Sequence, residues 1–190
     1  IINHQLVNYL ERHHLLSARQ FGFRRGLGTA DLLTALNHEW TLPTGSGGCS
    51  MVLAVDIAGA FDKVSHIGVT YKLQTLGVRD RALTWLTDYL SLRKLQAVVN
   101  GQSSSPYPIE SGVPQESILG PTLFLIYVYH AEQCLAPGCS LATFADDTTV
   151  YTCIGSPELL PNSKKSLQAT LDALHDWGKK WRIRFEPTNS

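Results

Sequence analysis

Apolar residues at helical spacing open the chain, and five later stretches also favour helix. Leu6, Tyr9, Leu10 and His13 would share one face of the first helix. Thr29 is a candidate N-cap for the second. The expected helices cover 1–16, 29–40, 66–76, 80–91, 117–134 and 163–181.

Runs of β-favouring residues predict strands between these helices. The apolar run 49–55 indicates a buried strand that ends at Asp56. One hairpin is expected between 95–100 and 107–110, and a tighter one between 141–144 and 148–153. A last short strand would follow at 182–185. Because helices alternate with hairpins, the pattern predicts an α+β fold.

The composition fits one compact domain, or part of a larger one. The chain has 190 residues, of which 44% are hydrophobic, which is enough for a core. It has no run of 18 or more apolar residues and no signal peptide, so no membrane partner is expected. The four cysteines match no zinc-binding spacing and the seven histidines form no ligand pattern. We therefore expect reduced thiols in an intracellular protein.

The charge is unevenly distributed although its sum is zero. No Lys or Arg occurs between Leu95 and Ser163, a window that contains six acids, whereas both flanks are basic. An acidic centre between basic flanks suits a cation site beside a polyanion. Ordinary solvated surface charge explains the pattern equally well.

Acidic residues at two strand ends are the sharpest candidates for chemistry. Asp146 and Asp147 occupy the tip of the tight hairpin, where adjacent like charges repel unless a cation compensates them. Asp56 follows an apolar strand, which is a frequent position for catalytic acids. An ordinary turn for the pair and a helix N-cap for Asp56 remain alternatives.

If these two sites converge, their carboxylates would share two divalent cations roughly 3.5–4 Å apart. Such a pair activates a 3′-hydroxyl and stabilises a leaving pyrophosphate. Oxygen ligands favour Mg²⁺ over zinc. Spacing alone leaves open an unrelated metal-dependent phosphotransferase, in which the two sites would lie far apart.

Four blocks, in order, resemble motifs of the reverse transcriptases of non-LTR (LINE-like) retrotransposons. They are 20–24 (Gln-Phe-Gly-Phe-Arg), 56–64 (Asp-Ile-Ala-Gly-Ala-Phe-Asp-Lys-Val), 111–121 (Ser-Gly-Val-Pro-Gln-Glu-Ser-Ile-Leu-Gly-Pro) and 144–147 (Phe-Ala-Asp-Asp). Residues 85–93 and 177–187 are also similar to that family, so the resemblance spans nearly the whole chain.

The resemblance implies a polymerase palm, with an antiparallel sheet that carries the acids and is backed by helices, plus part of the fingers. Residues 1–48 would be partial fingers and their connection to the palm, and 49–190 would be the palm. The N-terminal fingers and the thumb would lie outside this chain. The implied activity is RNA-directed DNA polymerisation, with an RNA template, a DNA primer, deoxynucleoside triphosphates and Mg²⁺ or Mn²⁺. The sequence indicates no oligomeric state.

The resemblance also assigns roles to single residues. Asp56, Asp146 and Asp147 would be catalytic and would bind metal, with Ile57 among the metal ligands. Gly59 and Ala60 would offer backbone N–H groups to the triphosphate. Phe61 would lie under the sugar and reject a 2′-hydroxyl. The remaining candidates are Gln115 for nucleotide or template, Ala145 beside the primer end, and Arg24 and Arg25 for template phosphate.

Plainer interpretations of some of these residues stay open. From the sequence alone, Phe61 also suits a core position, Gln115 a polar loop, and the arginine pair an exposed surface. Trp177 and Trp181 are expected to pack the last helix on the palm sheet.

Two positions depart from the family pattern. Glu116 stands where the family usually has Gly, so a carboxylate would face a triphosphate at a cost on the order of 4 kcal/mol. Such a cost slows incorporation roughly a thousandfold. Asn189 stands near the usual place of a Lys that is thought to protonate pyrophosphate. Two hypotheses follow, a polymerase palm that is impaired in this form, or a decayed palm that keeps its fold and binds nucleic acid.

Overall fold

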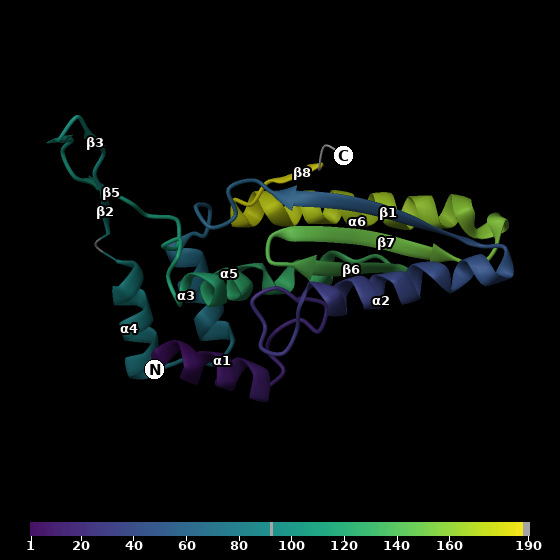
Figure 1. Cartoon of the computed structure of the whole chain (residues 1–190), viewed down its shortest axis with the longest axis horizontal. Coiled ribbons are helices and arrows are strands. Elements are labelled where there is room, and N and C mark those ends of the chain that lie inside the picture. Colours follow the sequence, from purple (N-terminus) through teal and green to yellow (C-terminus); the bar gives the residue numbers. More distant parts are fainter. Residues whose placement is uncertain (92, 188–190) are drawn as a thin grey trace.

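A four-stranded antiparallel sheet in the order β6-β7-β1-β8 forms one half of the protein (Figure 1). The computed structural model describes residues 1–91 and 93–187. The strands are β1 (Cys49–Ile57), β6 (Cys139–Phe144), β7 (Asp147–Ile154) and β8 (Phe185–Pro187). Val55 of β1 lies opposite Thr148 of β7, and Asp56 lies opposite Glu186 of β8. This register brings the C-terminal end of β1 beside the start of β7.

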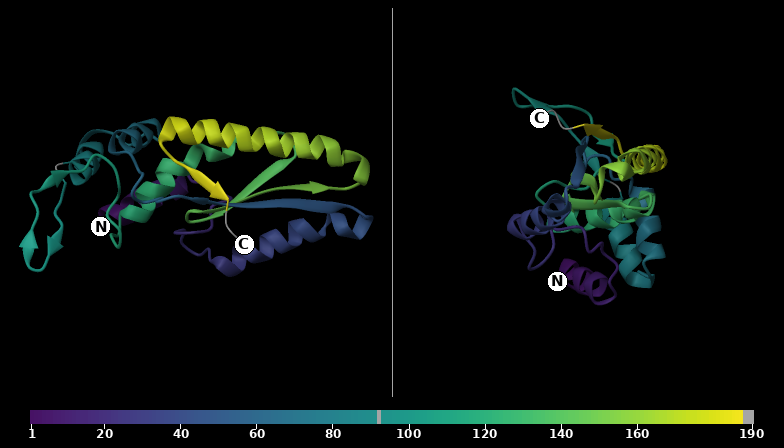
Figure 2. Two further views of the ribbon diagram at one scale, coloured as in Figure 1. Left: turned by 90° about the horizontal axis from the view of Figure 1, so that it is seen from above. Right: turned by 90° about the vertical axis from the view of Figure 1, so that its right-hand side faces the viewer.

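Two helices cover the opposite faces of this sheet, as Figure 2 shows. Helix α2 (Thr29–Thr41) packs Leu36 against Ala142 and Tyr151. On the other face, α6 (Leu160–Trp181) packs Leu174 against Leu141 and Val150. Since successive strand residues point to opposite faces, Leu141 and Ala142 necessarily serve different helices.

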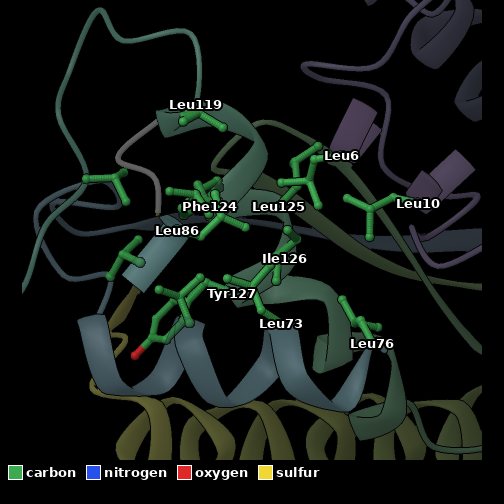
Figure 3. Close-up of a cluster of buried hydrophobic side chains, with 14 of the residues drawn as sticks. Leu6, Leu10, Leu73, Leu76, Leu86, Leu119, Phe124, Leu125, Ile126 and Tyr127 are labelled. Carbon is green, nitrogen blue, oxygen red and sulfur yellow. The ribbon is translucent and has the colours of Figure 1, made fainter. Parts of the chain in front are cut away.

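The largest hydrophobic core lies in the helical half of the molecule and surrounds helix α5 (Gly120–Val128) (Figure 3). Its sequence is apolar almost all round, and such a helix has to be buried on every side. Leu6 and Leu10, Leu73 and Leu86 cover it. They belong to α1 (Ile2–Arg12), α3 (His66–Thr75) and α4 (Asp80–Leu90).

A thin arm projects from the helical half beyond α4 (Figures 1 and 2). It contains two short pairings, β2 (Lys94–Leu95) with β5 (Tyr107–Pro108), and β3 (Val98–Val99) with β4 (Gln102–Ser103). All of these strand residues are exposed. The expected hairpin is therefore present, with its tight turn at Asn100 and Gly101.

The α+β fold expected from the sequence is confirmed, whereas several boundaries were wrong. The first helix ends at Arg12. The N-cap of the second helix is Gly28 and not Thr29 as expected, and the N–H of Gly28 donates to the Asp31 carboxylate. The expected helix 117–134 starts only at Gly120 and continues from Tyr129 to Cys134 as a 3₁₀ segment. The division between fingers and palm at residue 48 stays a prediction.

Two strands also differ from expectation. The run 49–55 is buried only toward its end, and the strand continues through Ile57. Because β8 pairs only with Val55–Ile57, the first half of β1 is a sheet edge, and Val52 is exposed. The strand expected at 182–185 begins only at Phe185, since Arg182 adopts a left-handed conformation that ends α6.

Other expectations concern single residues and segments. In the described part of the chain, the four cysteines are unpaired, as expected. The helices of that part are too short or too polar to cross a bilayer. Trp177 packs against Phe185 of the sheet, as expected, whereas Trp181 packs against Tyr127 of α5 in the helical half. Asn189 lies outside the described residues.

Candidate active site

The two acidic strand ends lie side by side at one end of the sheet. The pairing that sets Val55 opposite Thr148 leads directly to Asp56 on one strand and Asp147 on the other. Ala145 and Asp146 close the turn between β6 and β7. The pKa of Asp146 is raised above its ordinary value, chiefly by burial and further by the negative charges of Asp147 and Asp56. The three carboxylates therefore interact across the turn.

A buried glutamine from the distant N-terminal segment holds this turn. Gln20 is 4% exposed, and its side-chain oxygen accepts hydrogen bonds from the N–H groups of Ala145 (3.1 Å) and Gly22 (2.8 Å). Its side-chain nitrogen donates to the carbonyl of Ala145 (3.1 Å). Ala145 adopts a left-handed conformation, with φ of 60°, so the glutamine fixes a backbone that is otherwise unfavourable. We call this set of contacts the Gln20 clamp.

Gly22 permits the clamp. A Cβ atom at this position would lie 2.1 Å from the backbone nitrogen of Ala145, which no side chain tolerates. Phe21 also donates its N–H to the carbonyl of Thr143 (2.8 Å), so the segment runs beside the end of β6. Sequence reasoning quoted Gln20 only within a motif and gave it no role. The signal for it was a polar residue two positions before a glycine, which does not identify its partner.

A pocket of about 540 Å³ opens beside the acids. Its lining includes most of the candidate residues, which come from three separate motifs. Four of the lining side chains are carboxylates. The lining residues are Phe23, Asp56, Ile57, Gly59, Ala60, Phe61, Asp62, Gln115, Glu116, Ser117, Pro121 and Asp146. Among these described residues none is Lys, Arg or His, so the negative charge has no cationic partner in the wall. We call this cavity the acid pocket.

Aromatic packing fixes one wall of the acid pocket. The ring of Phe61 stacks on Phe124, with centroids 5.2 Å apart, and meets the edge of Phe23 at 5.9 Å. Phe61 is half-buried, so it belongs both to the core and to the pocket. Held from two sides, this ring has little freedom to move away from a ligand.

The loop that precedes α5 forms another part of the wall. The Gln115 side-chain nitrogen donates to the Asp62 carboxylate (3.2 Å). Glu116 has a φ of 58°, a left-handed conformation that favours glycine. Gly59, which also lines the pocket, has a φ of 60°. Two turns of unusual backbone therefore line the same pocket as the acids.

Some candidate residues lie outside the acid pocket. Ala145 instead lines a small internal cavity of about 30 Å³, and Asp147 is exposed. The Arg24 side chain is 12% exposed and forms a two-pronged ion pair with Glu11 at 2.5 and 2.6 Å. Arg25 is exposed. The template role assigned to these arginines stays a prediction, and Arg25 is the more accessible of the two.

The residues present fit a divalent cation. Asp56 and Asp146 offer hard oxygen ligands, and Ile57, whose side chain is buried, has only its backbone carbonyl to contribute. In the described part of the chain, no three His, Cys, Asp or Glu side chains gather into a ready metal cluster. Mg²⁺ commonly binds through one or two carboxylates, keeping water and substrate phosphates as its other ligands. The uncompensated carboxylates of the pocket suit that mode.

Comparison with known proteins agrees with this geometry. The family model described as reverse transcriptase (RNA-dependent DNA polymerase) matches residues 1–188. The RNA-directed DNA polymerase from mobile element jockey of Drosophila melanogaster is 33% identical over 172 residues, covering 87% of this chain and 18% of that protein. The probable polymerase from transposon X-element of the same species is 30% identical over 190 residues, covering 98% and 20%. The chain thus spans about a fifth of the length of these relatives.

A solved structure shares the fold. Apo telomerase from Candida tropicalis, truncated from its C-terminal domain, superposes with a TM-score of 0.60 at 10% identity. The match covers all of this chain and 40% of the telomerase chain. The similarity to jockey and the X-element also confirms the expected kinship with non-LTR retrotransposon enzymes. With its sequence, fold and acid pocket in agreement, the chain belongs to the reverse transcriptase family.

Proposed function

We propose that the acid pocket is the catalytic centre of an RNA-directed DNA polymerase, which adds deoxynucleotides to a primer 3′-end on an RNA template. The observation that carries the proposal is the meeting of Asp56 and Asp146 in one pocket without cationic side chains in its described lining. Two Mg²⁺ ions held there would activate the 3′-hydroxyl and offset the charge that develops on the phosphates.

The chain's own residues divide the remaining work. Asp147 raises the negative potential around Asp146 from its exposed position. The turn at Gly59 and Ala60 brings backbone N–H groups toward the triphosphate, because small side chains allow close approach. Phe61, fixed between Phe124 and Phe23, excludes a sugar with a 2′-hydroxyl.

Three further assignments belong to the same proposal. Gln115, tethered to Asp62, contacts the incoming nucleotide or the template base. Ala145, held by the Gln20 clamp, lies beside the primer end. Arg25 is free to meet template phosphate, whereas Arg24 must first leave Glu11.

A second candidate function is supported by Glu116. Its carboxylate lines the acid pocket, where it repels a triphosphate. A palm with this residue would keep its fold and bind nucleic acid without polymerising. Mn²⁺ or Mg²⁺ would then bind without supporting extension.

A chimera tests both candidates, because this chain matches a short part of its relatives. Replacing the matching segment of the jockey polymerase by this chain supplies the missing surroundings. We expect Mg²⁺-dependent primer extension on an RNA template, weak with Glu116 and stronger in Glu116→Gly. Asp56→Asn and Asp146→Asn should each lower the rate by at least about 100-fold.

Asp172→Asn, an exposed acid on α6, is the matched control and should leave extension unchanged. Extension that survives both Asp56→Asn and Asp146→Asn would contradict the proposed catalytic centre. Absence of extension in a folded Glu116→Gly chimera that still binds primer and template would favour the second candidate.

A further inference from the structure

Helix α4 carries a stack of side chains that the acid pocket does not use. The rings of Trp85 and Tyr89 are stacked, with centroids 5.7 Å apart and planes within 13°. The Arg93 guanidinium lies 4.7 Å from the centre of the Tyr89 ring and donates to the Tyr89 carbonyl (2.9 Å). Arg81 stands one turn before Trp85 on the helix, and Arg93 follows the end of the helix and reaches back over Tyr89. We call these four residues the α4 ladder.

Trp85 does not serve the core. Its side chain is 42% exposed, and it belongs to none of the buried clusters that the described residues form. The helix is anchored by its other face, where Leu86 and Leu90 are each 1% exposed. In contrast, the other three tryptophans pack against buried clusters. The Trp85 ring is therefore accessible at the surface, with the Tyr89 ring stacked on one side of it.

The charge around the ladder favours an anionic ligand. Arg79, Arg81 and Lys94 are exposed in the stretch of chain that contains the stack, and Arg93 lies over the Tyr89 ring. The acids of the same helix are Asp80 and Asp88. Cations beside open aromatic faces are the combination that binds single-stranded nucleic acid, since bases stack on the rings while phosphates meet the cations.

The ladder lies away from the acid pocket. Its residues line no part of that pocket among the described residues, and α4 stands at the end of the molecule from which the arm projects (Figure 1). A nucleic-acid strand engaged at both places would therefore extend well beyond the catalytic acids. Such a contact would hold the strand without touching the reacting atoms.

We propose that the α4 ladder binds an unpaired stretch of nucleic acid, with a base stacked on Trp85 and its phosphates near Arg81 and Lys94. That this strand is the template or the primer rests on the proposed polymerase function. The binding itself does not, because it requires neither metal nor nucleotide.

Fluorescence anisotropy on the full chain tests the proposal. The probes are labelled oligouridine and oligothymidine of about 12 nucleotides, and an abasic strand of the same length. Trp85→Ala should weaken binding of the base-bearing probes by about 5- to 100-fold, and Trp85→Phe by less. Tyr107→Ala, which removes a 72% exposed ring from the arm, is the matched control and should change little.

Further readouts decide the outcome. Saturating oligonucleotide should quench tryptophan emission in the unmodified chain and much less in Trp85→Phe. Equal affinity of Trp85→Ala and the unmodified chain, with equal thermal stability, would overturn the proposal, as would equal affinity for the abasic strand. Loss of self-association in Trp85→Ala with unchanged oligonucleotide affinity would overturn it in favour of protein docking.

Two comparisons keep this proposal separate from the catalytic one. Asp146→Asn should abolish extension in the chimera and leave the oligonucleotide affinity measured by anisotropy unchanged. A failure of extension alone therefore does not contradict the proposal for the α4 ladder. If Trp85→Ala changes neither extension in the chimera nor oligonucleotide binding, only the proposal for the α4 ladder is contradicted. Whichever probe binds more tightly, oligouridine or oligothymidine, identifies whether the preferred strand is RNA or DNA.

Discussion

At the level of single residues, Glu116 combines an unfavourable backbone with an unfavourable charge. Its φ of 58° is a conformation that glycine adopts freely and that L side chains resist by roughly 1–2 kcal/mol. The resemblance to reverse transcriptases predicted glycine at this position, and the backbone gives the physical reason for that preference. Its side chain also adds a carboxylate to the acid pocket.

Glu116→Gly is therefore expected to raise stability and activity together. Thermal unfolding of the isolated chain should shift upward by an amount equivalent to about 1 kcal/mol. Nucleotide incorporation by the chimera should rise at least about tenfold, since a repulsive charge leaves the proposed triphosphate site. Glu158→Gly, at an exposed acid outside the pocket, controls for charge removal. A lower melting temperature in Glu116→Gly would contradict the backbone argument.

Asp146 makes stability depend on pH and on metal. A carboxyl whose pKa is raised in the folded state favours its protonated form in the fold. Its contribution to the free energy of unfolding is therefore greatest below the ordinary pKa and is lost as pH rises through the raised pKa. In chelator, Asp146→Asn should therefore be more stable than the unmodified chain at neutral pH. Mg²⁺ should raise the melting temperature of the unmodified chain and much less that of the variant. Equal responses of both to Mg²⁺ would remove Asp146 from the metal site.

At the level of elements, the Gln20 clamp joins the segment before α2 to the β6–β7 turn. We expect Gln20→Leu to destabilise the chain by about 1–3 kcal/mol, because it leaves buried backbone groups of Ala145 and Gly22 unpaired. In the chimera, it should lower the maximal rate more than it changes the Michaelis constant for nucleotide. Gln168→Leu, at an exposed glutamine of α6, is the control. Wild-type rates in a destabilised Gln20→Leu would assign the clamp to stability alone.

Lys72 lies at the junction of α3, α5 and α6, where it is fully buried. It donates to the Tyr127 carbonyl, and its ammonium nitrogen is 3.9 Å from the centre of the Trp181 ring and 5.0 Å from that of Trp177. Burial lowers its pKa to about 7, and the charge of Lys180 acts in the same direction. The ring faces favour the cation and oppose that shift.

Lys72→Met should remove a pH-dependent destabilisation of the folded chain. The unfolded chain holds the Lys72 proton up to the ordinary pKa of 10.5, whereas the fold releases it near 7, so stability rises with pH between these values. At pH below 7 the methionine variant should be more stable by about 1–2 kcal/mol, and the gain should shrink toward pH 10. Denaturant unfolding across this range measures it, with exposed Lys165→Met as control. A gain that grows with pH would contradict the assignment.

Elements with a clear period and clear punctuation could be predicted from the sequence. The helices flanking Gly77 fall within a residue of their expected bounds. Helix α5 could not be delimited, because a segment buried on all sides has no polar face to mark its start and end. The position of β8 depends on the left-handed Arg182, which no pattern of apolar residues reveals.

At the level of the whole molecule, the arm is a part whose strands bury little surface. Its strands are two residues long and exposed, so the chain should open there at the lowest cost. Limited trypsin digestion followed by mass spectrometry should cut after Lys94 before it cuts after Lys164 or Lys165 in α6. First cleavage within α6 would contradict this order of opening.

The acids of the candidate site could be found from the sequence, whereas the residues that hold them in place could not. Asp56 and Asp146 stand in short motifs next to strands, and antiparallel pairing brings them together. Gln20 reaches the turn across 125 residues, and nothing local announces its partner. Trp85 fits a helical pattern equally well as a core or an exposed residue, so only the packing of its neighbours distinguishes the two.

The Gln20 clamp has a consequence for how this gene can shrink. A protein starting at residue 49 would retain Asp56, Asp146 and Asp147 and would still lose the glutamine that shapes the turn between β6 and β7. Deletions from the upstream side would thus disrupt the geometry of the proposed catalytic centre before any of its acids is lost. Counting intact acids in shortened gene copies would overestimate how many of them encode a working centre.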